Sequence, residues 1–151
     1  MSIAAAIRRG AFNPHAVDLL KQLDLWLPLS PNVEPHLRAL RDLLSVHSTR
    51  LWIVYLPSLV QVSDRYVEPQ LELSRGPDRS FTGERDQAQA RAVGEKCSKL
   101  GLPFLDLTPA LQKREAEGIR MYWEFDAHMR PEGYAASASE IFMWWMRTRG
   151  G

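Results

Sequence analysis

The sequence lacks the features that define several protein classes. It has one cysteine, Cys97, which excludes a disulfide framework and a cysteine-rich metal site. Its 19 Lys and Arg residues nearly balance 18 Asp and Glu residues, so no strong field attracts nucleic acid or an anionic membrane. No apolar run approaches the roughly 18 residues that a membrane-spanning helix needs. We therefore expect no nucleic-acid partner and no membrane span.

An export signal is also missing from the chain as written. The apolar run at residues 3–7 is too short for a signal-peptide core, and Arg8 and Arg9 follow it rather than precede it. A cytoplasmic location fits the chain as written, and a periplasmic one fits a longer parent protein with its own leader. The location therefore stays open.

The composition, 45% apolar and 25% charged, is typical of an ordinary globular domain, and we expect one domain over residues 1–151. The order of its predicted helices and strands indicates the α/β class. Apolar spacing, proline and capping residues predict helices over about 14–27, 34–48 and 83–100, a short helix from Thr108 and a last helix from Pro131. We expect strands at 51–56 and 102–107 and a weaker one at 121–125. The segment 58–82 is expected to be irregular, with a helical turn near 64–72. The last helix should bury Tyr134, Ala138, Ile141, Phe142 and Trp145.

The two stronger strands indicate a parallel sheet. Leu51–Leu56 is apolar throughout and closed by Pro57, which is typical of a strand buried on both faces. The order of helix, Gly101, strand and helix is the α/β alternation of such a sheet. Two or three strands make a thin sheet with exposed edges. Either the chain self-associates or it is the later half of a larger α/β domain, and the second interpretation is favoured.

Asp126 and His128 are the strongest candidates for chemistry. They lie two residues apart in an expected strand-to-helix loop, where the carboxylate can orient the imidazole and stabilise its charged form. The alternative is a plain helix cap with His128 exposed, which the spacing alone favours. The other histidines, at positions 15, 36 and 47, lie at predicted helix ends and are expected to be surface residues. Glu68, Glu72 and Asp64 form no metal-ligand pattern.

The phrase around this pair resembles the last conserved block of SGNH (GDSL-type) hydrolases: Asp126-x-His128-x-x-Pro-Glu-Gly-Tyr, then small residues and an apolar helix. It is most similar to the branch of alginate-type O-acetyltransferases. The segments 51–62 and 100–107 resemble two strand blocks of the family, so the likeness runs from about residue 37 to 146. The resemblance implies a flavodoxin-like sheet and ester hydrolysis or O-acyl transfer without metal or cofactor. An acylated polysaccharide or small ester would be the substrate, Asp126 the orienting group and His128 the general base.

One part of the family pattern is missing, because the sequence contains no Gly-Asp-Ser. Ser58 follows a strand and Ser30 lies between two prolines, but neither is expected between a strand and a helix. We therefore expect the later portion of an SGNH-like domain, with the base but not the nucleophile, that is nearly inactive alone. The rival hypothesis is a non-catalytic module that associates through its sheet edge and its Trp-rich last helix.

Overall fold

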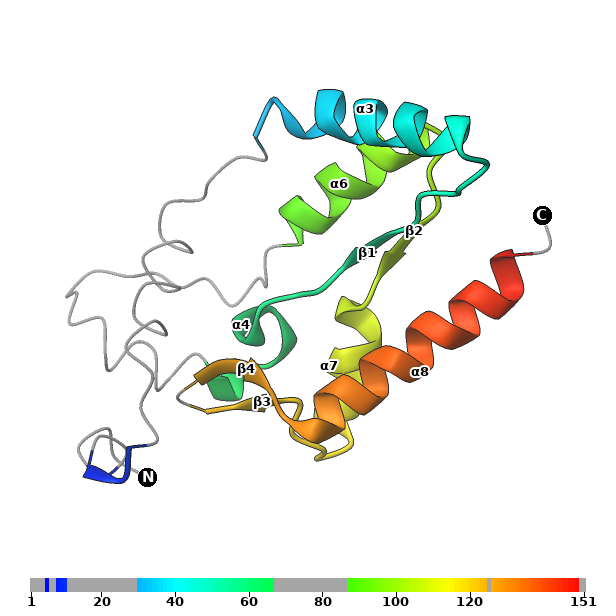
Figure 1. Ribbon diagram of the computed structural model, residues 1–151. Coiled ribbons are helices and arrows are strands. Elements are labelled where there is room, and N and C mark those ends of the chain that lie inside the picture. The colour runs from blue at the N-terminus through cyan, green and yellow to red at the C-terminus, as the bar shows by residue number, and fades with distance from the viewer. Residues whose placement is uncertain (1–4, 6–7, 11–29, 67–86, 125, 150–151) are drawn as a thin grey trace.

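The computed structural model describes residues 5, 8–10, 30–66, 87–124 and 126–149 of the chain. Its centre is a parallel pair of strands, β1 (Ile53–Tyr55) and β2 (Phe104–Asp106). Helices α3 (Val33–Val46) and α6 (Ala88–Lys99) lie on one side of this pair, and α7 (Thr108–Ala116) and α8 (Pro131–Thr148) on the other (Figure 1). The protein is thus a mixed α/β fold, as the alternation of apolar runs predicted.

The register of the two strands explains why both sides are covered. Ile53 pairs with Phe104 and Val54 with Leu105. Because successive side chains of a strand point to opposite faces, the first pair packs toward α6 and the second toward α7. One face therefore meets a cluster of three buried residues: Cys97, Leu100 and Leu102. The other meets a cluster of nine: Leu59, Val60, Val62, Tyr66, Leu107, Leu111, Met121, Tyr122 and Met129.

A second, antiparallel pair of strands lies at one end of the molecule. β3 (Tyr122–Trp123) and β4 (Asp126–Met129) pair with Tyr122 opposite Met129. Beside them lie the short helix α4 (Leu59–Val62) and the 3₁₀ turn η1 (Asp64–Tyr66), which follow β1 (Figure 1). Met129, from the hairpin, is buried in the same cluster as the residues of α4. The end of β1, the hairpin and the start of α8 thus converge.

Local signals in the sequence account for several features of the structure. Gly101 ends α6 with φ of +66°, the left-handed conformation that glycine adopts without strain. Asp106 Oδ1 accepts the Thr108 N–H at 2.8 Å, which caps α7. Cys97 is buried, and burial raises the pKa of its thiol. The helix expected at 14–27 and the segment 67–86 lie outside the described residues.

Two expectations about burial were wrong. The strand at 51–56 is shorter and only half-buried, and Leu56 is 54% exposed, because the described sheet has only two strands. In α8 the buried residues are Gly133, Ser137 and Trp144, whereas Tyr134 and Phe142 are more than half exposed. Trp144 takes the core position because its ring packs edge-on against Trp52, with 4.9 Å between the ring centroids.

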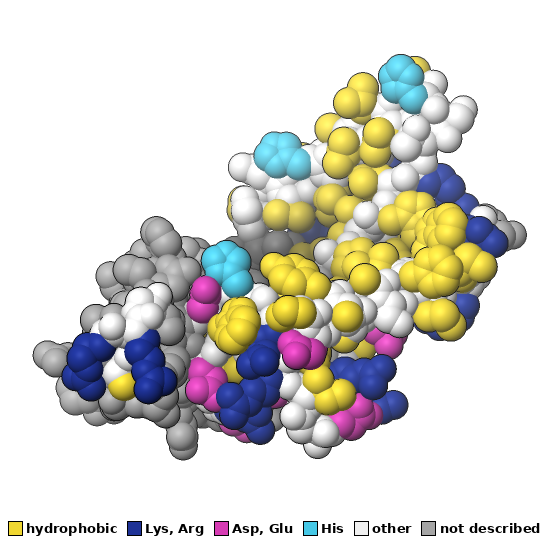
Figure 2. Space-filling view, turned by 60° about the horizontal axis from the view of Figure 1, so that its bottom comes forward, with side chains coloured by type: hydrophobic (Ala, Val, Ile, Leu, Met, Phe, Trp, Pro, Cys, Tyr) yellow, Lys and Arg dark blue, Asp and Glu magenta, His cyan; other side chains and the backbone are white. Residues whose placement is uncertain are grey.

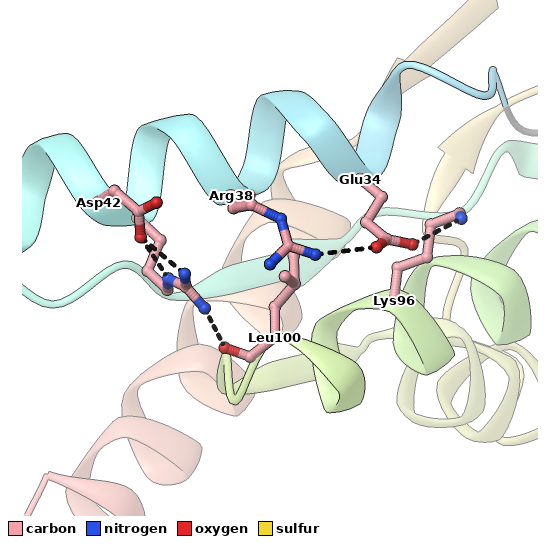
Figure 3. Close-up of polar contacts among 6 residues, drawn as sticks. Glu34, Arg38, Asp42, Lys96 and Leu100 are labelled. Carbon is pink, nitrogen blue, oxygen red and sulfur yellow. Dashed lines mark hydrogen bonds and ion pairs between the residues drawn. The ribbon is translucent and has the colours of Figure 1, made fainter.

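Helix α3 is attached by polar contacts as much as by burial, and none of its residues is fully buried. Glu34 accepts hydrogen bonds from Arg38 at 3.2 Å and from Lys96 of α6 at 3.3 Å (Figure 3). These cations, Lys96 first, lower the pKa of Glu34. Arg41 also donates to the carbonyl oxygen of Leu100 at 3.0 Å. Among the helices of the described ranges, none is both long and apolar enough to span a membrane.

Candidate active site

The structure brings Asp126 and His128 into direct contact. Asp126 Oδ1 lies 2.5 Å from His128 Nδ1 and also accepts the backbone N–H of His128 at 3.1 Å. A carboxylate can only accept, so Nδ1 carries the proton in this bond. The neutral imidazole then has its lone pair on Nε2. This arrangement is the one that prepares a histidine to take a proton from another group.

The local backbone differs from the expected loop. Both residues belong to strand β4, and α8 begins at Pro131, only two residues after the strand ends. Residues two apart in a strand project from the same face. That geometry explains how Asp126 can reach the ring of His128. The spacing of the pair therefore has a structural reason, although the loop placement was wrong.

His128 lines a small pocket of about 200 Å³ where the three elements converge. Leu56 and Pro57 come from the end of β1, Leu59 from α4, and Tyr134 from the first turn of α8. The complete lining is Leu56, Pro57, Ser58, Leu59, Tyr122, His128, Met129 and Tyr134. Most of this lining is apolar, so the histidine borders a space suited to a small apolar group.

The walls of the pocket are tied together by a tyrosine. The Tyr122 hydroxyl donates to the carbonyl oxygen of Pro57 at 2.5 Å, linking β3 to the segment after β1. Burial raises the pKa of Tyr122, so its hydroxyl keeps its proton and remains a donor. No motif points to this residue, because its role depends on a contact across 65 positions.

A buried hydrogen-bond network joins the hairpin to η1 and α7. The Tyr66 hydroxyl donates to Glu115 Oε1, which also accepts the Met121 N–H at 2.6 Å. The Tyr122 N–H in turn donates to the Tyr66 oxygen at 3.1 Å. Burial, together with the bond to Glu115, raises the pKa of Tyr66 to about 12. These bonds fix β3 against α7 and η1, while the other carboxylate oxygen, Glu115 Oε2, is buried without a hydrogen-bond partner among the described residues.

Ser58 lies in the same pocket as His128. It is the N-cap residue of α4 and stands three positions after β1, so the expectation that it lacks a strand-and-helix setting was wrong. Gln61 Oε1 accepts the Ser58 N–H at 2.9 Å and the Ser58 hydroxyl at 3.2 Å. Serine followed three residues later by glutamine is a capping-box pattern. This signal in the sequence predicts α4 and was missed.

The other residues that the sequence offered as candidates for chemistry do not line this pocket. His36 lies in α3 and His47 follows it, both exposed, and Ser30 is an exposed residue before the same helix. His15, Glu68 and Glu72 lie outside the described residues. Where the structure describes the chain, no three His, Cys, Asp or Glu side chains group as metal ligands do. Comparisons with models of protein families, with curated proteins and with solved structures find no match to this chain.

Proposed function

We propose that this protein is an SGNH hydrolase-like domain, or its later portion, that catalyses ester hydrolysis or O-acyl transfer. The observation that carries the proposal is the 2.5 Å contact between Asp126 and His128 at the edge of a small pocket. His128 is 68% exposed, as the cap alternative expects, but a plain cap would leave the imidazole without this partner. The resemblance of the surrounding phrase to the last SGNH block supports the same function, and so does the mixed α/β fold.

In this proposal His128 is the general base and Asp126 its orienting group. Nε2 takes a proton from the attacking hydroxyl, while the ionised Asp126 stabilises the imidazolium that forms. Pockets for drug-sized ligands measure about 300–1,000 Å³, so one of about 200 Å³ fits a short acyl group. The proposed substrates are therefore small acyl esters, including acetylated carbohydrates whose sugar stays outside the pocket.

Hydrolysis of 4-nitrophenyl acetate by the full chain and its variants tests this function. General-base catalysis contributes about 10²–10⁴-fold, so His128→Ala should lower the rate at least about tenfold, and Asp126→Ala should lower it as well. His36→Ala and His47→Ala are matched controls, since both remove an exposed histidine on or beside α3. Equal rates in His128→Ala and His47→Ala would contradict the proposal.

A second candidate function is non-catalytic association, and exposed apolar residues favour it. Large apolar side chains of α8 reach the surface, as do those on one side of α3, and Figure 2 shows them as a band across one face of the molecule. They are Tyr134, Phe142, Met143, Trp145 and Met146 of α8, and Leu40, Leu43 and Val46 of α3. Contiguous apolar patches mark association surfaces. The partner would be a second copy of the chain or the earlier half of the domain.

Sedimentation tests the association through a second copy. The chain should sediment as a concentration-dependent oligomer, and Phe142→Gln should shift it toward the monomer. Arg120→Gln, a change at an exposed charged residue outside α8, is the control. A monomer at high micromolar concentration would contradict self-association.

A further inference from the structure

We infer that Ser58 is the nucleophile that delivers its proton to His128. The inference rests on the proposed function and replaces the expectation that no nucleophile is present in this chain. It begins from one observation: Ser58 and His128, which are 70 positions apart in the sequence, line the same pocket.

The position of Ser58 in the fold suits this role. It follows the carboxyl end of β1, the edge of a parallel sheet where ligands usually bind. Its backbone is held from both sides. The Tyr122 hydroxyl binds the carbonyl of Pro57, and the Gln61 side chain accepts the Ser58 N–H. Since Tyr122 belongs to the hairpin that carries His128, the same bond fixes the two pocket walls relative to each other.

The hydroxyl oxygen of Ser58 takes part in the capping box of α4, whereas its proton is only weakly held. Its bond to Gln61 Oε1 is 3.2 Å long, whereas hydroxyl bonds are usually about 2.7–2.8 Å. Gln61 Oε1 already accepts the Ser58 N–H at 2.9 Å, and the Gln61 amide donates to the Tyr55 hydroxyl at 3.0 Å. Gln61 therefore stays in place without the hydroxyl bond. Rotation about the Cβ–Oγ bond can release the Ser58 proton from Gln61 toward the pocket that His128 also lines, with the other two bonds of Gln61 kept.

The reaction is a two-step acyl transfer. Ser58 Oγ attacks the acyl carbon, its proton passes to His128 Nε2, and the leaving alcohol departs with that proton as the ester C–O bond breaks. Water or a carbohydrate hydroxyl then attacks the acyl-Ser58 ester and gives its proton to His128. Ser58 recovers the proton as the carboxylic acid or the new ester is released.

The test separates a nucleophile from a helix cap. Ser58→Asn keeps a good capping side chain but has no hydroxyl, and Ser58→Ala removes both. Ser63→Ala is the matched control, because Ser63 ends the same helix and is absent from the pocket lining. The full chain and each variant are treated with a fluorophosphonate and with 4-nitrophenyl acetate. Peptide mass spectrometry then locates any adduct.

We expect the adduct on Ser58 in the wild type and in Ser63→Ala, and at least a tenfold loss of hydrolysis in both Ser58 variants. Labelling of Ser58 should also fall at least tenfold in His128→Ala. An adduct elsewhere, no adduct, or full activity in Ser58→Asn would overturn the inference. If hydrolysis then still depends on His128, the proposed function stands without Ser58. If hydrolysis depends on neither residue, the proposed function fails too.

Discussion

The two faces of the β1–β2 sheet are covered by different kinds of core. The face toward α7 and α8 meets nine buried residues and the Tyr66–Glu115 network, whereas the face toward α6 meets three. Helix α3 adds no fully buried residue to the second face. The pocket with His128 lies on the side of the larger cluster. The strand that carries Asp126 and His128 is therefore packed against the larger of the two clusters.

The largest expected difference between the two faces is the cost of a core truncation. Leu111 is completely buried in the larger cluster, whereas Leu37 of α3 is only half-buried against the smaller one. Leu111→Ala should lower the free energy of unfolding by about 2–5 kcal/mol, and Leu37→Ala by about 1 kcal/mol or less. Urea unfolding measures both. Equal losses would contradict the packing difference.

A glycine on each face gives the next comparison. A Cβ on Gly133 of α8 would lie 2.3 Å from the carbonyl oxygen of Met121, whereas one on Gly94 of α6 would lie 3.1 Å from the ring of Phe104. Backbone cannot move aside as a side chain can, so Gly133→Ala should cost about 1–3 kcal/mol. Gly94→Ala gains helix propensity of about 1 kcal/mol and should be nearly neutral. Thermal unfolding of the two variants checks this order.

Alkaline pH should lower the free energy of unfolding, because Tyr66 in the larger cluster then loses its proton. Its pKa is raised from 10.0 to about 12, so folding favours the protonated form. This stabilisation is complete below pH 10 and is lost as the pH rises toward 12, by up to about 3 kcal/mol at roughly 1.4 kcal/mol per unit. Unfolding at pH 9 to 11 measures it. Tyr66→Phe should reduce this dependence and leave the part that comes from the raised pKa of Tyr122, and Tyr134→Phe, at an exposed tyrosine, should leave it unchanged.

The smallest effect is expected at the α3–α6 ion pair. Lys96 and Glu34 are 3.3 Å apart with side chains 26% and 29% exposed, so Lys96→Met should cost less than about 1 kcal/mol. The difference from wild type should vanish in about 1 M salt, where the screening length is about 3 Å. A loss that persists at high salt would show that the lysine stem, rather than its charge, holds α3.

The sequence predicts the parts of this fold that depend on local signals. The apolar runs around Val54 and Leu105, the turn at Gly101 and the cap at Asp106 each act within a few residues, and the structure has all of them. The face of α8 could not be predicted in this way. Residues 141–146 are apolar on every side, so periodicity selects no face, and the choice of Trp144 depends on Trp52 far along the chain.

The candidate site also has one part that depends on neighbouring residues and one that depends on contacts far along the chain. The contact between Asp126 and His128 is one of the two alternatives that the sequence left open, and it joins neighbours within one strand rather than in the expected loop. The pocket was not expected, because it requires Tyr122 to bind Pro57 and Ser58 to lie opposite the hairpin. No local pattern encodes contacts across more than sixty residues.

The central claim is that Asp126 holds His128 as a base with its proton on Nδ1, and ¹⁵N NMR of the histidine rings tests it most directly. The exposed His36 and His47 serve as references in the same spectrum. In the neutral form, His128 should be protonated on Nδ1 in the wild type and should lose this preference in Asp126→Ala. A His128 ring protonated on Nε2 in both proteins would contradict the claim and remove the base on which the proposed chemistry depends.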